Sequence, residues 1–215
     1  MTDERPIDEL VNQLIARAPE FTIKGFAMMS YNPAIGRVLE KGGVDKFRAM
    51  AWEHVQRLTG VRTPEEYDNF HDAFVAAVRE NLRTNKGEEL SYGQAQKPVN
   101  VFMKVLVLFA NLPTRESAST LKPFLHVPLD SVVMEYFQSH YPADYRQFIM
   151  PVIEDYRTAA KAGGSSVTLP DRLFLDLRSV FNKDHYYAWQ RLFRALYPKC
   201  PVLLDFVWSV NRDAA

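Results

Sequence analysis

Apolar residues recur at helical spacing along most of the chain, which predicts a series of amphipathic helices. The first apolar face follows Pro6, a residue suited to a first helical turn, and consists of Ile7, Leu10, Val11, Leu14 and Ile15. A second helix is expected over residues 44–58, ahead of Gly60. A third is expected over residues 63–83, where Thr63, Pro64 and Glu66 form a capping pattern. Further helices are expected over residues 98–110, 131–139, 142–161, 171–181, 185–196 and 202–210.

Alternating strand patterns are hard to find, because the β-branched clusters sit inside helical periods. We therefore expect an all-α, globular multi-helix fold. The segment Gly163–Ser166 is the clearest flexible break in the chain. We expect a single domain over residues 1–215, with two helical lobes around a cleft, 1–90 and 91–215, as the alternative arrangement.

The composition is that of a globular protein, with 47% hydrophobic and 24% charged residues in a chain of 215. A chain of this size can bury a core without a disulfide, and the single cysteine, Cys200, has no partner for an internal bridge. The charged N-terminus lacks the apolar region of a signal peptide, and no apolar run approaches the length of a membrane span. A cytoplasmic protein without membrane contact is expected.

Charge is balanced overall, with 26 basic and 26 acidic residues, which argues against a general nucleic-acid coat protein. The distribution is nevertheless uneven. Residues 1–20 hold two basic and five acidic residues, a net charge of −3, and residues 183–199 hold four basic and one acidic, a net charge of +3. The second run predicts either a local basic surface or an ordinary solvated helix face.

The segment from Leu90 to Phe137 places polar residues within apolar helical runs. Pro98 disfavours the helical conformation at the residue before it, so Lys97 is expected at the entrance of the helix over residues 98–110. Asn100 and Lys104 follow on the same face. The positive end of a helix disfavours a protonated lysine, and a neutral lysine can attack carbon. Lys97 is therefore a candidate nucleophile, with a surface lysine as the alternative.

Asp130 follows Pro128 and directly precedes the apolar period of residues 131–139, so it is expected to cap that helix. A capping carboxylate is ionised and fixed in place, and a catalytic carboxylate beside a developing cation needs the same two properties. His126 lies four residues earlier and is expected either to line the same cleft or to be a hydrogen-bonded structural residue.

The order of these features resembles the helix-hairpin-helix DNA glycosylases, in particular the lysine-bearing 8-oxoguanine glycosylase/lyases of the archaeal type. Residues 92–102, YGQAQKPVNVF, look like the hairpin with its lysine. Residues 126–134, HVPLDSVVM, look like the segment that carries the aspartate of the family. The similarity is confined to residues 90–137, in which 33 residues separate Lys97 from Asp130.

The resemblance implies a DNA N-glycosylase with AP-lyase activity, acting on duplex DNA that carries an oxidised or modified base. Lys97 would form a Schiff base at the sugar C1′, and Asp130 would stabilise the cationic transition state. A C-terminal aromatic residue near an acid, here Trp208 and Asp205, resembles the base pocket of the archaeal enzymes. The residues expected to contact the substrate are Gly93, Gln94, Asn100, Lys104, His126, Asp205 and Trp208.

Two other functions remain open from the sequence. One is a non-catalytic helical protein-binding module, in which Lys97, Asn100 and Lys104 form a contact face. The other is a reader that binds modified DNA without cutting it. No metal site or cofactor is expected, because the histidines lack a metal-binding spacing and Asp68 with His71 is a single i,i+3 pair. Glycine-rich loops for a nucleotide phosphate are also missing.

Overall fold

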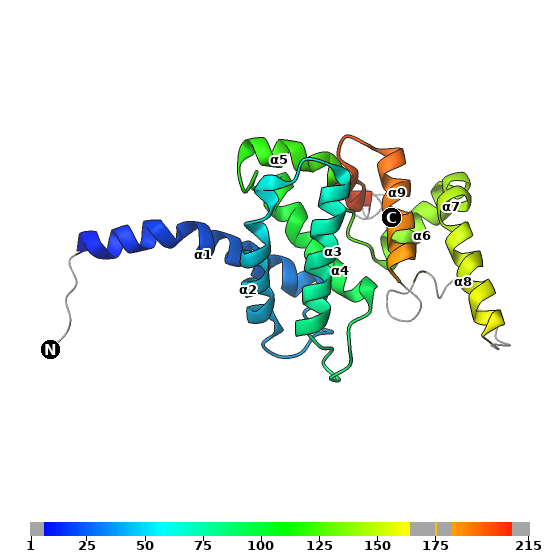
Figure 1. Cartoon of the computed structure of the whole chain (residues 1–215), viewed down its shortest axis with the longest axis horizontal. Coiled ribbons are helices and arrows are strands. Elements are labelled where there is room, and N and C mark those ends of the chain that lie inside the picture. The colour runs from blue at the N-terminus through cyan, green and yellow to red at the C-terminus, as the bar shows by residue number, and fades with distance from the viewer. Residues whose placement is uncertain (1–6, 164–174, 176–181, 208–215) are drawn as a thin grey trace, which may run out of the picture.

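The computed structural model describes residues 7–163, Leu175 and residues 182–207. Secondary structure in these residues is helical, and the β-pairing found there is limited to two isolated bridges, Leu39 with Thr84 and Arg83 with Glu89 (Figure 1). The predicted all-α fold is confirmed. None of the described helices combines the length and the apolar composition needed to cross a bilayer.

The first part of the chain forms α1 (Ile7–Ile35), α2 (Gly43–Val55), the 3₁₀ turn η1 (Leu58–Gly60), α3 (Pro64–Asn81) and α4 (Tyr92–Met103). A π-helical segment, η2 (Lys104–Phe109), continues α4 directly. The remaining elements are α5 (Arg115–Leu121), the 3₁₀ turn η3 (Lys122–Phe124), α6 (Ser131–His140), α7 (Pro142–Phe148), α8 (Met150–Ala162), α9 (Lys183–Leu196) and the 3₁₀ segment η5 (Pro201–Phe206).

Helix α4 is central to the arrangement, since it packs against α1, α3 and α9. The N-terminal part of α1 extends away from the other helices, and α6, α7 and α8 lie at the opposite end of the molecule (Figure 1). One connected cluster of buried apolar side chains runs from Ile23 on α1 to Val202 on η5. This core fixes the positions of α4, η2, α6 and η5, which carry the candidate site.

Two predicted helix starts are confirmed in detail. The Thr63 side chain accepts a hydrogen bond from the Glu66 backbone N–H, and Glu66 completes a capping box, so α3 begins where its sequence pattern indicates. Asp130 caps α6 through its side chain, which accepts from the Val133 N–H at 2.9 Å. Both signals are local, because each joins a side chain to a backbone group three residues later.

The predicted start of the helix at residues 98–110 is wrong. Helix α4 begins at Tyr92, because Ser91 and Gln94 form a capping box there. Pro98 lies inside the helix, where a proline costs about 3 kcal/mol or more. Burial of most of α4 in the core offsets that cost. Lys97 therefore lies in the second turn, and the predicted effect of the helix dipole on it, which is confined to the first turn, does not apply.

Other boundaries also differ from the sequence pattern. The helix predicted over residues 142–161 divides at Ile149 into α7 and α8, with Pro151 in the first turn of α8. Residues 201–206 form a 3₁₀ segment in place of the first turns of an α-helix. Helix α5, which Thr114 caps, was not predicted. Three predictions fall largely outside the described residues. They concern the helix over residues 171–181, of which only Leu175 is described, the break at Gly163–Ser166, of which only Gly163 is described, and Trp208.

Candidate functional site

Lys97 and Asp130 meet at the junction of α4 and α6. The Nζ atom of Lys97 lies 3.0 Å from Oδ2 of Asp130. The other carboxylate oxygen, Oδ1, caps α6 and so holds the carboxylate in place. Both side chains are partly exposed, Lys97 at 23% and Asp130 at 33%, so solutes can reach the pair. Two residues 33 positions apart in the sequence thus form one accessible contact.

A second lysine–aspartate pair lies beside the first. The ammonium of Lys104, at the start of η2, contacts the Asp205 carboxylate of η5 and stands 4.8 Å from the centre of the Phe206 ring. This pair is more buried, with side-chain exposures of 11% and 9%. Burial raises the pKa of Asp205, with Asp130 adding to the effect, while Lys104 and then Lys97 oppose it. We call these four residues, Lys97, Asp130, Lys104 and Asp205, the lysine–aspartate cluster.

Several other residues that were predicted to contact the substrate are instead buried or cap a helix. Gly93 is buried, and the Gln94 side chain completes the cap of α4 by accepting from the Ser91 N–H at 3.0 Å. Asn100 and His126 are fully buried within the protein. The prediction that Asn100 forms a contact face with Lys97 and Lys104 is therefore wrong. The Asn100 side chain is buried in the core and cannot contact another protein.

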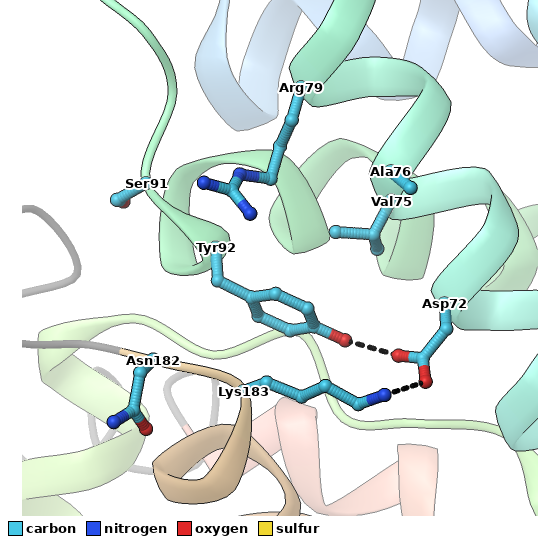
Figure 2. A pocket seen from close by; sticks show the side chains of 8 residues that line it. All are labelled: Asp72, Val75, Ala76, Arg79, Ser91, Tyr92, Asn182 and Lys183. Carbon is cyan, nitrogen blue, oxygen red and sulfur yellow. Dashed lines mark hydrogen bonds and ion pairs between the residues drawn. The ribbon is translucent and has the colours of Figure 1, made fainter.

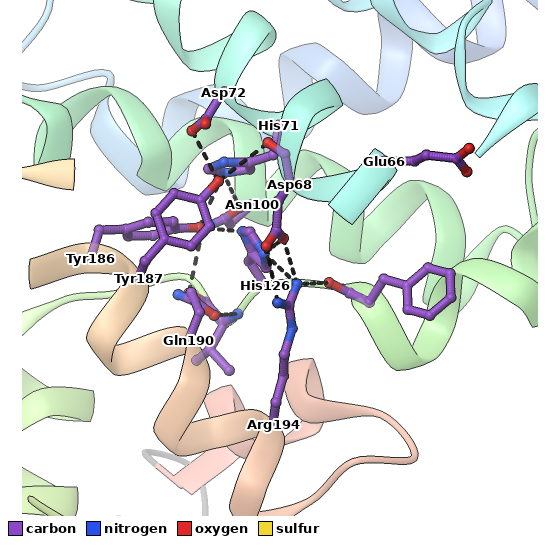
Figure 3. A network of polar contacts seen from close by, with 12 residues as sticks. Glu66, Asp68, His71, Asp72, Asn100, His126, Tyr186, Tyr187, Gln190 and Arg194 are labelled. Atoms are coloured by element: carbon purple, nitrogen blue, oxygen red, sulfur yellow. Dashed lines mark hydrogen bonds and ion pairs between the residues drawn. The ribbon is translucent and has the colours of Figure 1, made fainter. Parts of the chain in front are cut away.

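Asn100 and His126 belong to a buried network of polar side chains that joins α3, α4 and α9 (Figure 3). Asn100 donates through Nδ2 to Gln96 Oε1 at 2.7 Å and to the Tyr186 hydroxyl at 2.8 Å. Its Oδ1 lies 2.9 Å from Nε2 of His71. The same Tyr186 hydroxyl lies 2.8 Å from Nδ1 of His126. These contacts satisfy most of the hydrogen-bonding groups of the network, and Nδ1 of His71 is the atom of these side chains that has no hydrogen-bond partner among the described residues.

The network ends at an ion pair between α3 and α9. Arg194 donates to both oxygens of Asp68, at 2.6 and 3.1 Å, and His126 Nε2 lies 2.8 Å from Asp68 Oδ1. Although burial opposes the shift, hydrogen bonds from His126 and Arg194 hold the pKa of Asp68 below its usual range. Burial lowers the pKa of both His126 and His71. The lowered pKa values favour the neutral form of both histidines, and the charge lies on Asp68 and Arg194.

Tyr186, His126 and Asp68 are connected in the order of a nucleophile, a base and an orienting carboxylate. Burial excludes that role, since Tyr186 and His126 have exposures of 0% and 1%. Burial also raises the pKa of the Tyr186 hydroxyl well above its ordinary value. The network is therefore structural, and it holds α9 against α3 and α4.

The basic run of residues 183–199 is partly neutralised in the fold. Arg194 pairs with Asp68, and Lys183 Nζ lies 2.5 Å from Asp72 Oδ2. Arg191 and Lys199 are exposed. The basic surface that the sequence left open is thus smaller than its formal charge suggests.

A cleft of about 440 Å³ lies between α3, the start of α4 and the start of α9 (Figure 2). Asp72 on its wall accepts from the hydroxyls of Tyr92 at 2.7 Å and Tyr187 at 2.9 Å, and it pairs with Lys183. Arg79 also lines this cleft. Because three donors already surround the Asp72 carboxylate, it is positioned as part of the structure and is poorly placed to hold a metal ion.

We expect the protein to lose stability in mild acid because His185 is buried. Burial lowers the pKa of His185 to about 4, whereas an unfolded histidine titrates near pH 6.5. Between about pH 4 and about pH 6.5, His185 binds a proton in the unfolded state but not in the folded state. The stability present above about pH 6.5 therefore decreases as the pH falls through this range. From about pH 7.5 to about pH 5, His185 alone should account for about 2 kcal/mol of unfolding free energy.

Urea unfolding at the two pH values measures this loss, and the variant His185→Phe should lose about 2 kcal/mol less than the wild type over the same range. An equal pH dependence in the two proteins would contradict the assignment to His185. The exposed Asn69 supplies the control, because Asn69→Leu removes no titratable group and should leave the pH dependence as it is in the wild type.

The described residues contain no group of three or more His, Cys, Asp or Glu side chains arranged to hold a metal ion. Comparisons with protein-family models, with curated proteins and with solved structures find no match to this chain. Interpretation of the lysine–aspartate cluster therefore depends on its own geometry and on the sequence pattern of residues 90–137.

Proposed function

We propose that the protein is a DNA glycosylase with AP-lyase activity, in which Lys97 is the nucleophile and Asp130 the catalytic carboxylate. The observation that carries the proposal is the 3.0 Å contact between Lys97 Nζ and Asp130 Oδ2. An amine nucleophile needs a neighbouring base, and here an ionised carboxylate lies at hydrogen-bond distance. The duplex DNA partner and a cytoplasmic setting belong to the same proposal.

The chemistry requires a proton to leave the lysine before it attacks. Asp130 accepts a proton from the Lys97 ammonium, and the freed amine forms a bond to C1′ of the damaged nucleotide. The bond from C1′ to the base breaks, its electron pair leaves with the base, and the base takes up the proton that Asp130 accepted from the lysine. The C1′–O4′ bond then breaks as one N–H proton moves to O4′, and the open sugar is joined to Lys97 by an iminium ion. Loss of a C2′ proton then breaks the C3′–O bond and nicks the strand.

The fixed position of Asp130 supports this assignment. Its Oδ1 atom is held by the Val133 N–H, so Oδ2 stays directed at the lysine without further ordering when substrate binds. Partial exposure of the pair allows a flipped nucleotide to approach, whereas the buried network offers no such access. The neighbouring pair, Lys104 and Asp205, adds two charges to the same region, where a polar base edge could be bound.

Borohydride trapping tests the proposal directly. Wild-type protein incubated with a duplex that carries 8-oxoguanine or an abasic site should give a covalent protein–DNA adduct, because borohydride reduces the iminium to a stable amine. Lys97→Ala should give no adduct. Lys46→Ala is the matched control, since Lys46 also pairs with a carboxylate, Glu40, but lies on the surface, and it should react as the wild type does.

Asp130→Asn separates catalysis from capping. Asparagine is as good a helix cap as aspartate, so the melting temperature should change little while base removal slows by about a hundredfold or more. The absence of an adduct from folded wild-type protein, or an adduct that persists in Lys97→Ala, would reject the proposal. Binding of the modified duplex without an adduct would instead support a reader of modified DNA.

A further inference from the structure

Helix α1 has two apolar faces, and its own chain covers only one of them. The 29 residues of α1 extend for about 43 Å. Ile23, Ala27, Tyr31 and Ile35 are buried against the body of the protein. The N-terminal part of the helix projects beyond that body (Figure 1). A second, outer face therefore remains open along most of the helix.

The outer face has the spacing of a coiled-coil seam. Its residues alternate at intervals of four and three, and we call them the outer stripe: Val11, Ile15, Ala18, Thr22, Gly25 and Met29. The largest of them are strongly exposed, Ile15 at 67% and Met29 at 61%. Three stripe residues, Ile15, Ala18 and Thr22, also line a groove of about 490 Å³, and its other lining residues are uncharged and belong to α1, the segment from Trp52 to Thr59 and Leu112–Pro113. Exposed apolar surface of this extent on a regular seam is typical of an interaction site.

The outer stripe is complementary to itself when a second α1 runs antiparallel to the first. With the two-fold axis at Glu20, Val11 of one copy faces Met29 of the other, and Ala18 faces Thr22. Ile15 then faces Gly25, where an added side-chain carbon would meet no atom within 4 Å. A large side chain thus enters the space that a glycine leaves, which is the packing of a knob into a hole.

Charge favours the same direction. Asp8 and Glu9 lie in the first turn of α1, and an antiparallel partner brings this acidic end towards the other end of α1. Arg37 and Lys41 follow α1 there and are exposed. A parallel pair would instead bring the two acidic ends together. Opposite charges at both ends of a two-fold interface favour the antiparallel pair over the parallel one.

We infer that the chain forms a homodimer through antiparallel pairing of the outer stripes of two α1 helices. The occupant of the exposed face is a second copy of this chain. The interface is isologous, so each copy contributes the same residues. The inference is independent of the lysine–aspartate cluster and of its proposed chemistry, because it concerns a different face of the molecule.

Sedimentation of the full chain from about 1 to about 100 μM tests the inference. The wild type should sediment as a dimer at the upper concentrations, and Ile15→Glu should weaken the dimer at least tenfold. Ala16→Glu adds the same charge at the next residue, outside the stripe, and should leave the dimer intact. Circular dichroism should report equal helix content in the three proteins. A wild type that stays monomeric throughout, or equal effects of the two variants, would overturn the inference.

Cysteine cross-linking tests the direction of the pair. In the antiparallel dimer Val11 of one copy lies beside Met29 of the other, whereas the two Val11 residues are separated by about 27 Å along the helix axis. A mixture of the variants Val11→Cys and Met29→Cys should therefore form a disulfide-linked dimer under oxidation, and neither variant should do so alone. A linked dimer from either variant alone, or none from the mixture, would refute the antiparallel pairing.

Discussion

Asp205→Ala is expected to lower the unfolding free energy by about 3 to 5 kcal/mol, because it leaves the buried Lys104 ammonium without its partner. Urea unfolding followed by circular dichroism measures the change. The surface pair of Lys46 and Glu40 is the control, since Glu40→Ala should cost far less than Asp205→Ala. A cost no larger for Asp205→Ala than for Glu40→Ala would contradict the expectation.

Replacement of both partners should behave differently from replacement of one. Burial raises the pKa of Asp205 even though Lys104 opposes the shift. The unfavourable free energy of removing the carboxylate from water therefore exceeds the favourable interaction with Lys104. The double variant Lys104→Met, Asp205→Leu removes both buried charges and keeps a flexible apolar side chain beside Phe206. Its stability should therefore return to within about 1 kcal/mol of the wild type or exceed it.

Asn100→Leu is expected to cost about 3 kcal/mol or more, despite the similar size of the two side chains. The substitution removes hydrogen bonds to Gln96, Tyr186 and His71, and each loss leaves a buried polar group less well satisfied. In a chain of this length the melting temperature should fall by roughly 6 to 12 °C. Calorimetry or thermal circular dichroism measures the shift.

The surface variant Asn69→Leu on α3 is the control for that measurement, and it should change stability by about 0.5 kcal/mol at most. Tyr186→Phe removes the hydroxyl that links Asn100 to His126 and should also destabilise the protein. Because the two residues share one network, the double variant should lose less than the two single losses combined. A strictly additive loss would show that the hydrogen bonds are energetically independent.

The features that the sequence predicted correctly are those that depend on neighbouring residues. The caps at Thr63 and Asp130 join a side chain to a backbone N–H three residues later, and such patterns are visible in a sequence. The start of α4 was placed wrongly because Pro98 is a local signal that a non-local effect outweighs. Core packing around Val99 and Phe102 keeps the helix intact on both sides of the proline.

The pairing of Lys97 with Asp130 was expected from the family resemblance and not from local pattern. The buried network was missed because its partners lie far apart in the chain; Asp68 and Arg194 are separated by 126 residues. One signal was present in α9, where Tyr186, Gln190 and Arg194 recur every four residues along a face that is otherwise apolar. Polar residues aligned on such a face must find partners inside the protein.

The contact of Lys104 with Asp205 joins positions 101 residues apart and has a consequence for the growing chain. Helices α1 to α4 leave the ribosome well before η5 does, so Lys104 is made long before its carboxylate. Until Asp205 has left the ribosome, this amine has no carboxylate partner, so η2, which continues α4, lacks one of its contacts with η5. Fragments truncated ahead of η5 should therefore assemble poorly, however complete their other helices are.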